Sequence, residues 1–315
     1  MIRLDKLKIK VPIKHIKNIN EKQFNETYSV GILEKRQYNT NKESSLYIKI
    51  DYLNDELVIE FTGKILKDRY PELINKHNIR NCFENINKMG ICQLDIDSII
   101  RDAEVLLCDV TKDVICVDIK ALENYIRANI VNYKNWIVEP YRKGIALRKI
   151  CSTKNAAERI IIYDKGKRIN MASEKAFLNS LNDKEKLQSY FSDKIRFERN
   201  LTTKQKIRDA MKIVEPNLMD VLESECNPLL AVLDLALQQP SYTNDTAIIT
   251  SLKDRKNDSF LKEYNYDMSA VEKEVRRLAP KNPNIKTQMK PLRELHRRVM
   301  NNKMPLFDAR DLVRD

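Results

Sequence analysis

Glycine is scarce in this chain, with only five among 315 residues. Glycine-rich loops surround phosphates with backbone N–H groups, but neither G-x-x-x-x-G-K-[ST] nor G-x-G-x-x-G occurs here. The sequence therefore argues against P-loop ATPases and Rossmann-type dinucleotide-binding enzymes. It also has no repeat of fixed period and no long low-complexity tract.

Histidine and paired cysteine, the usual ligands of zinc, are also sparse. Three histidines, His15, His77 and His296, lie far apart, and the six cysteines include no C-x-x-C pair. Zinc sites need such ligands at short spacing. We expect reduced, mostly buried thiols, no zinc site, and none of the His-hydrophobic-His metal motifs common among DNA-nicking enzymes.

Long apolar runs are missing as well. No stretch approaches the roughly 20 consecutive apolar residues that span a bilayer. The N-terminus alternates lysine with leucine and isoleucine, unlike the basic end and apolar block of a secretory signal. We expect a soluble, cytoplasmic protein without a membrane partner.

Basic charge is abundant: 57 Lys and Arg against 45 Asp and Glu give a net charge of +12. Such an excess favours an acidic partner such as nucleic acid. It is concentrated in a run that contains one acid, Glu294, and nine basic residues: Arg276, Arg277, Lys281, Lys286, Lys290, Arg293, Arg297, Arg298 and Lys303. The run is compatible with a solvated helix surface, but its one-sided charge favours contact with DNA phosphates. It lacks the bulky apolar anchors of a membrane-surface helix.

Hydrophobic periodicity divides the chain at about residue 202. Before it, period-two segments at 7–11, 46–50, 57–62, 105–110, 114–117, 159–163 and 194–201 predict strands, with helices over 69–90 and 119–132. After it, helical spacing dominates 203–214, 218–238, 269–279 and 291–300. We predict an α+β fold, in which residues 1–202 form an antiparallel-rich central sheet with flanking helices. Residues 203–315 are predicted to form a helical, basic C-terminal region.

Three acids interrupt strands that are otherwise apolar: Glu60, Asp109 and Glu198. A buried carboxylate is costly unless it is paired or binds a metal, and oxygen ligands suit Mg²⁺ or Mn²⁺. The alternative is that these acids lie on a solvent-exposed face of the sheet, which antiparallel sheets often have, and pair there with lysines. That alternative is weakest for Asp109, whose neighbours are all apolar or a thiol.

A fourth strand carries a candidate nucleophile. Tyr163 ends the isoleucine-rich segment 159–163, and Lys165 lies on the same side by period two. A phenol with a pKa of about 10 is a poor nucleophile, but a nearby ammonium and cation favour its phenolate. A packed strand-end tyrosine with its hydroxyl in water is the competing interpretation.

These segments together resemble the filamentous-phage gene II/X replication initiators, which nick DNA for rolling-circle replication, and, less separably, the trans-acting plasmid Rep initiators. Five segments match in order and rough spacing over residues 1–200: Met1-Ile-Arg-Leu-Asp-Lys-Leu-Lys-Ile-Lys-Val-Pro12, Leu57-Val-Ile-Glu60-Phe-Thr-Gly-Lys-Ile-Leu66, Leu107-Cys-Asp109-Val-Thr111, Ile161-Ile-Tyr163-Asp-Lys165 and Ile195-Arg-Phe-Glu198-Arg. One departure is that Lys167-Arg168 follows the tyrosine motif, where relatives often carry a glutamate.

The resemblance implies a metal-dependent DNA nickase. In it, Glu60, Asp109 and Glu198 hold Mg²⁺ or Mn²⁺, Tyr163 attacks the scissile phosphate, and Lys165 stabilises the phosphoryl charge. The 5′ end stays on the tyrosine and a 3′-hydroxyl is released as primer. Arg196 is expected either to clamp a phosphate or to form a structural ion pair. Implied partners are origin DNA, which the basic run would bind, and host helicase and polymerase; a homodimer is left open.

Two other functions are compatible with parts of the sequence. A non-catalytic DNA-binding replication or repressor protein would keep the basic C-terminal run and make the strand acids structural. Leu295-His296-Arg297-Arg298 superficially resembles the basic motif of tyrosine recombinases, but no tyrosine follows it, since the last one is Tyr266. Three mid-strand carboxylates favour the enzyme.

Overall fold

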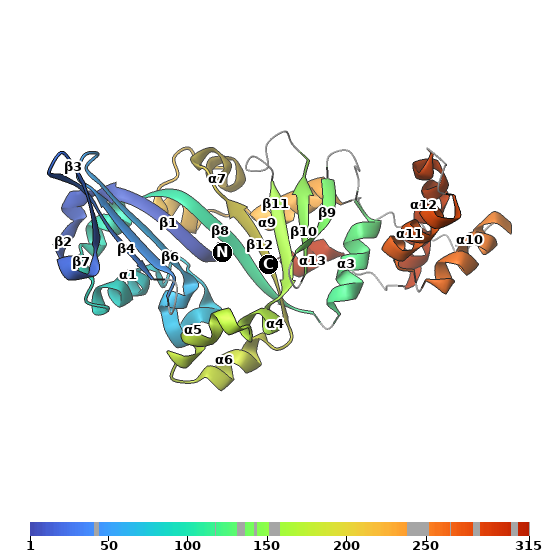
Figure 1. The fold of residues 1–315 in the computed structure, drawn as a ribbon, viewed down its shortest axis with the longest axis horizontal. Coiled ribbons are helices and arrows are strands. Elements are labelled where there is room, and N and C mark those ends of the chain that lie inside the picture. Colours follow the sequence, from blue (N-terminus) through green and yellow to red (C-terminus); the bar gives the residue numbers. More distant parts are fainter. Residues whose placement is uncertain are drawn as a thin grey trace.

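The structure is a computed structural model that describes residues 1–40, 44–116, 118–130, 136–141, 144–150, 158–237, 252–264, 266–279, 284–303 and 308–314, without the side chains of 300–303. Its centre is a fully antiparallel ten-stranded sheet of order β3-β4-β5-β6-β1-β8-β12-β11-β10-β9 (Figure 1). The strands are β1 (Leu4–Pro12), β3 (Asn25–Ser29), β4 (Ile32–Thr40), β5 (Leu46–Asp51), β6 (Glu56–Thr62), β8 (Glu104–Ile115), β9 (Trp136–Tyr141), β10 (Gly144–Lys149), β11 (Arg159–Asp164) and β12 (Lys194–Leu201). A separate pair consists of β2 (Ile16–Ile19) and β7 (Cys92–Leu94).

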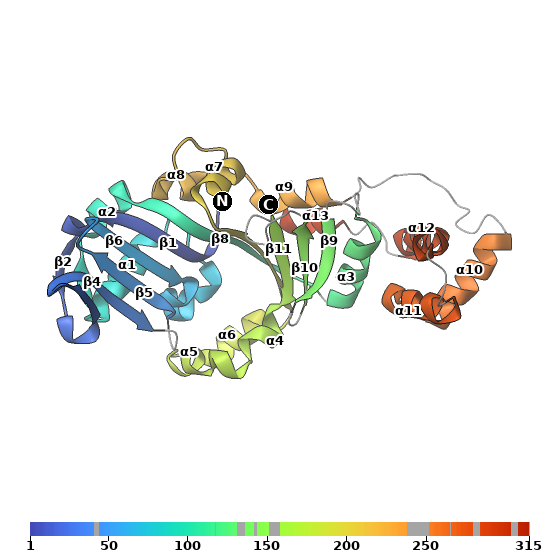
Figure 2. The same cartoon turned by 45° about the horizontal axis from the view of Figure 1, so that its top comes forward.

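One face of the sheet is apolar because the strands alternate. In β1, Leu7, Ile9 and Val11 are buried while the lysines between them reach the other face. The apolar face packs against helices from both halves of the chain (Figure 2). These are α1 (Ile79–Lys88), α2 (Ile96–Asp102), α3 (Ile119–Ala128), α7 (Lys204–Met211), α8 (Leu218–Glu223), α9 (Pro228–Ala236) and α13 (Ala309–Val313).

The opposite face is polar, and short helices cover one end of it. A second apolar cluster joins Tyr70 and Leu73 to Ile169, Phe177 and Phe191. It fastens the 3-10 segment η3 (Gly63–Glu72) to α4 (Lys165–Ile169), η5 (Ala172–Glu174), α5 (Lys175–Asn179) and α6 (Lys184–Phe191). Two further 3-10 turns, η1 (Ile13–His15) and η2 (Glu21–Gln23), flank β2.

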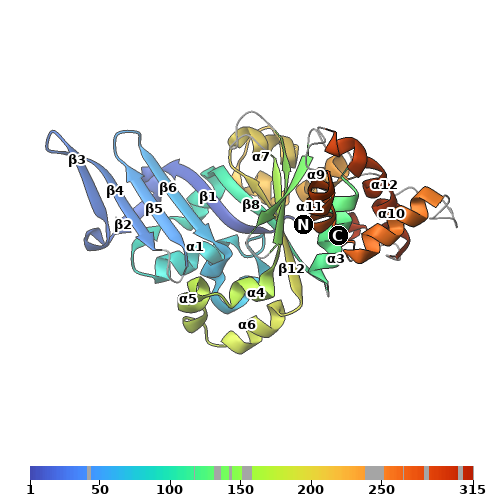
Figure 3. The same ribbon diagram turned by 45° about the vertical axis from the view of Figure 1, so that its right-hand side comes forward.

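The C-terminal helices α10 (Leu252–Glu263), α11 (Met268–Leu278) and α12 (Ile285–Lys303) have their own apolar core, centred on Leu261, Val271, Met289 and Leu295. They lie beyond α3, at the end of the molecule away from β3 (Figure 3). The predicted boundary at residues 202/203 therefore does not separate two cores. Residues 204–237 and 309–313 belong to the core of the sheet, because their apolar helix faces complete its apolar side.

The predicted α+β fold is confirmed. The segments 105–110 and 114–117 form one strand, β8, up to Ile115; Val117 lies outside the described residues. The helix predicted over 69–90 begins only at Ile79, since residues 69–72 belong to the 3-10 segment η3 and the chain then turns at Leu73 with φ of 54°. The helix predicted over 218–238 is two helices, because Pro228 starts a new one.

The prediction missed six strands, β2, β3, β4, β7, β9 and β10, and six helices, α2, α4, α5, α6, α10 and α13. Across the described ranges, no helix combines the length and apolar character needed to cross a membrane.

Candidate active site

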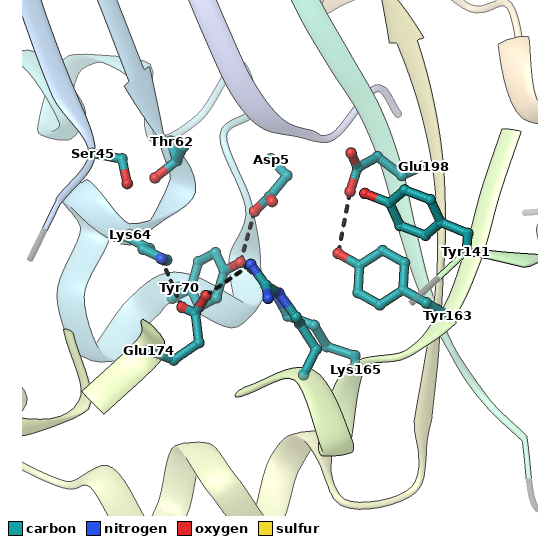
Figure 4. Close-up of a pocket in the computed structure, with 11 residues that line it drawn as sticks. Asp5, Ser45, Thr62, Lys64, Tyr70, Tyr141, Tyr163, Lys165, Glu174 and Glu198 are labelled. Carbon is teal, nitrogen blue, oxygen red and sulfur yellow. Dashed lines mark hydrogen bonds and ion pairs between the residues drawn. The ribbon is translucent and has the colours of Figure 1, made fainter. Parts of the chain in front are cut away.

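A cavity of about 250 Å³ opens on the polar face, where β1, β11 and β12 meet η3 and α4 (Figure 4). Its lining includes Tyr163, Lys165 and Glu198, which the sequence assigns to two separate motifs. Asp5 and Tyr70 complete this side of the cavity. The structure thus brings the predicted nucleophile, its lysine and one predicted metal ligand to one place.

Tyr163 lies near the end of β11 and is 8% exposed. Its hydroxyl donates a hydrogen bond to Glu198 Oε2 at 3.2 Å, across the β11–β12 pair. Burial raises the pKa of this phenol well above its usual value; the Arg196 charge opposes the rise and Glu198 adds to it. The hydroxyl is therefore a neutral donor here, and its activation needs added positive charge or a base.

Lys165 is the first residue of α4, whose N-terminus is capped by the Asp164 side chain. Its ammonium is buried and donates to the Tyr70 hydroxyl at 2.7 Å. It also lies over the Tyr70 and Phe191 rings, at 4.9 Å and 5.4 Å from their centroids. Burial and then the Arg196 charge lower the pKa of Lys165 to about 8. Lys165 is thus oriented by Tyr70.

Asp109 and Glu198 lie on the neighbouring strands β8 and β12. Glu198 is opposite Thr111, so it is a diagonal neighbour of Asp109, two residues along β8. Asn200, opposite Asp109, donates to Glu198 Oε1 at 3.1 Å. Burial and the Glu198 charge raise the pKa of Asp109 to about 7, and burial and Asp5 raise the pKa of Glu198. Two buried carboxylates that repel one another are stabilised by a shared cation, so this oxygen donor pair fits Mg²⁺ or Mn²⁺.

Glu60 does not join that pair. Strand β1 lies between β6 and β8, so Glu60 is opposite Lys8 whereas Asp109 is opposite Lys6. Its carboxylate forms ion pairs with Lys6 and, at 3.1 Å, with Lys8. The predicted three-carboxylate site is therefore not assembled, and the described ranges contain no group of three Asp, Glu, His or Cys side chains placed to hold a metal. Pairing with lysines, the alternative stated for such acids, describes Glu60.

Arg196 is a structural ion pair and not a phosphate clamp. It is fully buried, and its Nε and Nη2 donate to the two Asp113 oxygens at 2.6 Å and 2.7 Å. Its Nη1 lies 2.9 Å from Asp5 Oδ1 and donates to Tyr70 Oη at 3.0 Å. A guanidinium satisfied in this way offers no donor to DNA, which corrects its predicted DNA-binding role.

Asp5, Tyr70 and Asp113 were not predicted as site residues. Asp5 has a signal in the sequence: Leu4 and Leu7 are both buried although three positions apart, so period two fails there. The structure has a register shift between Leu4 and Lys6, and this β-bulge brings Asp5 into the cavity. No pattern in the sequence predicts that Tyr70, which follows the turn at Lys67, lies in the cavity.

The cavity lining also includes two cations beside a buried acid. Lys64 Nζ and Arg168 Nη2 lie 2.7 Å and 3.3 Å from the buried Glu174 carboxylate, which leaves one surplus positive charge. Gly63 precedes Lys64, and a Cβ on it would approach the Tyr70 ring to 3.1 Å. Arg168, noted above as a departure from the resembled family's pattern, thus contributes positive charge to the cavity wall.

The basic C-terminal run is partly neutralised by nearby acids. Arg276 and Arg293 pair with Glu272, Arg277 with Glu274, and Arg298 with Asp254, all at 2.6–2.8 Å. Lys286 and Lys290 are exposed on α12, and Arg297 is half-buried there. Lys281 and the Lys303 side chain lie outside the described residues. These partner acids precede Arg276 in the sequence, so they lie outside the basic run.

No protein-family model matches this chain, and no curated protein matches it. The resemblance to the phage and plasmid initiators therefore stays a prediction, and the geometry of the cavity is what bears on function.

Proposed function

We propose that this protein is a replication initiator that nicks origin DNA through Tyr163. It leaves a 5′-phosphotyrosine link and a free 3′-hydroxyl, and later rejoins the ends, as in rolling-circle replication. One observation supports this most: Tyr163, Lys165 and Glu198 line one cavity together with Lys64 and Arg168. A nucleophile that shares a cavity with a buried lysine and two half-buried cations is an arrangement suited to phosphoryl transfer.

In this proposal the Tyr163 oxygen forms a bond to the scissile phosphorus and the bond to the 3′-oxygen breaks. Glu198, which already accepts the Tyr163 hydrogen bond, takes the phenol proton, and the leaving 3′-oxygen takes a proton from solvent to become the free hydroxyl. Lys165, Lys64 and Arg168 stabilise the charge on the phosphoryl oxygens. One phosphodiester replaces another, so rejoining by the reverse step needs no ATP.

Asp109 and Glu198 would hold the divalent cation. When bound, it would neutralise phosphate charge and favour the phenolate. The DNA ends would pass to a host polymerase and helicase, and α10–α12 would contact origin duplex through exposed basic residues such as Lys286 and Lys290.

The test is an adduct assay on single-stranded fragments of the presumed origin with Mg²⁺ or Mn²⁺, quenched with detergent. We expect wild type to form a detergent-resistant protein–DNA adduct and Tyr163→Phe to form none, because the attacking oxygen is gone. Tyr141→Phe is the matched control, since Tyr141 lines the same cavity. Chelator and Asp109→Asn should each reduce the adduct strongly.

Two outcomes would contradict the proposal. An adduct that survives Tyr163→Phe moves the nucleophile to another residue. No adduct with any metal, while salt-sensitive binding to a verified origin persists, favours the alternative of a non-catalytic DNA-binding replication or repressor protein.

A further inference from the structure

A second cavity, of about 410 Å³, adjoins the first on the polar face of the sheet. The two share Ser45 and Thr62 in their lining, so they form one continuous depression. Its walls come from β1, β4, β5 and β6, and include Lys6, Lys8, Tyr47 and Glu60. The depression thus leads from the candidate nucleophile toward the β3 edge of the sheet.

The second cavity has the chemistry of a binding site for an anionic chain with flat groups. Lys6 and Lys8 are about one-third exposed and lie on the same side of β1. The Lys8 ammonium is 5.8 Å from the centroid of the Tyr47 ring. Lysines beside an aromatic ring suit single-stranded nucleic acid, whose unpaired bases expose faces for stacking that a duplex conceals.

Glu60 occupies the place of an anion in this cavity. One of its carboxylate oxygens contacts Lys6 and the other contacts Lys8, as two oxygens of a phosphate would. Burial opposes ionisation, but the two lysines hold the pKa of Glu60 below its usual value, so it is charged. A bound phosphate group has to compete with this carboxylate for the two ammonium groups.

We propose that the cavity of Lys6, Lys8 and Tyr47 binds single-stranded DNA that flanks the nicked phosphate, and that Glu60 is an internal competitor for that strand. The inference rests on the proposed function for the strand's identity, but it concerns binding rather than the chemical step. It gives Glu60 a role opposite to that of a metal ligand: its removal strengthens binding and leaves the nucleophile intact.

The experiment measures the affinity of full-length Tyr163→Phe protein for a fluorescent single-stranded oligonucleotide at several salt concentrations. Adding Lys8→Gln should weaken binding several-fold and lower the slope of log K against log salt by about 0.7. Adding Glu60→Gln should tighten binding several-fold. Lys17→Gln is the matched control, because Lys17 is an exposed lysine of β2 outside the cavity and should change nothing. Thermal unfolding of each variant checks the fold.

Wild-type affinity in a folded Lys8→Gln variant would overturn the inference, as would weaker binding in Glu60→Gln. If Lys8→Gln lost as much affinity for a duplex of the same sequence as it does for the single strand, the assignment to single-stranded DNA would be overturned. Adduct assays on protein that retains Tyr163, run beside the binding measurements, separate the two proposals. If the adduct forms normally and Lys8→Gln binds the strand with wild-type affinity, only the single-strand binding inference is wrong. No adduct, with the expected affinity changes, sinks the nicking proposal alone.

Discussion

At the scale of single residues, burial shifts the pKa values of the side chains in the cavity away from those of the same residues in water. Lys165 and Tyr163 are ordinary in sequence, yet both are enclosed beside Tyr70 and Arg196. Burial disfavours the charged form of each, so the lysine loses its proton more easily and the phenol less easily. The two groups consequently respond to pH in ways that peptides do not.

The pH dependence of adduct formation should report Lys165. Its pKa of about 8 means that the ammonium is charged below that pH and neutral above it. We expect the ratio of the wild-type rate to that of Lys165→Met to be largest below pH 8 and to fall as pH rises through 8. Single-turnover rates from pH 6 to 9.5 test this. A ratio that stays constant across the range would exclude a role for the Lys165 charge.

At the scale of elements, close backbone contact fixes where α4 lies. A Cβ added to Gly166 would approach the Phe191 carbonyl oxygen to 2.6 Å, so α4 packs directly on the end of α6. The first residue of α4 is Lys165, and its side chain reaches the Phe191 ring. The position of the lysine therefore depends on a residue that takes no part in the chemistry.

Gly166→Ala should displace α4, because the backbone it meets cannot yield as a side chain would. We expect a loss of stability of about 1–3 kcal/mol, typical of overpacking, together with slower adduct formation. Lys167→Ala, on the exposed side of the same helix, should stay within about 0.5 kcal/mol of wild type. Urea unfolding and the adduct assay measure both. Unchanged stability in Gly166→Ala would show that α4 is free to shift.

At the scale of the whole molecule, the described residues form a main apolar core under the sheet, a smaller cluster around Tyr70 and Phe177, and a separate core among α10, α11 and α12. The chain returns to the sheet after α12, where Arg310 of α13 is buried and pairs with Asp234 and Asp308. The exposed lysines of α12 thus lie on a helix with a core of its own, and α12 is separate from β11, the strand that carries Tyr163 (Figures 1 and 2).

Replacing Lys286 and Lys290 together by glutamine should weaken binding to origin duplex and leave the cavity unaffected. Loss of two phosphate contacts lowers the slope of log K against log salt by about 1.8. Adduct formation on a short single strand should remain at the wild-type rate. The matched double variant Lys184→Gln with Lys186→Gln, on exposed positions of α6, should bind duplex normally. An unchanged salt slope in the α12 variant would remove this helix from the duplex interface.

The sequence by itself determined the local features. Period-two alternation in residues 7–11 and 57–62 specified which side chains are buried, since a strand that reversed them would expose its leucines and isoleucines. The position of Tyr163 near the end of a strand placed its hydroxyl and Lys165, which begins α4, at the same end of that strand. The α+β class followed from such patterns, whereas the shared location of Tyr163, Lys165 and Glu198 was implied by the resemblance to the replication initiators.

Only the tertiary structure decided which charges meet. Glu60 and Asp109 were both candidate metal ligands in the sequence, but strand order places β1 and its lysines between them, so one is neutralised and the other faces Glu198. Arg196 is bound to Asp113, and Tyr70 reaches Asp5 across 65 positions of sequence. Periodicity describes one strand at a time, whereas strand order, a bulge and a turn depend on the free energy of pairing distant segments.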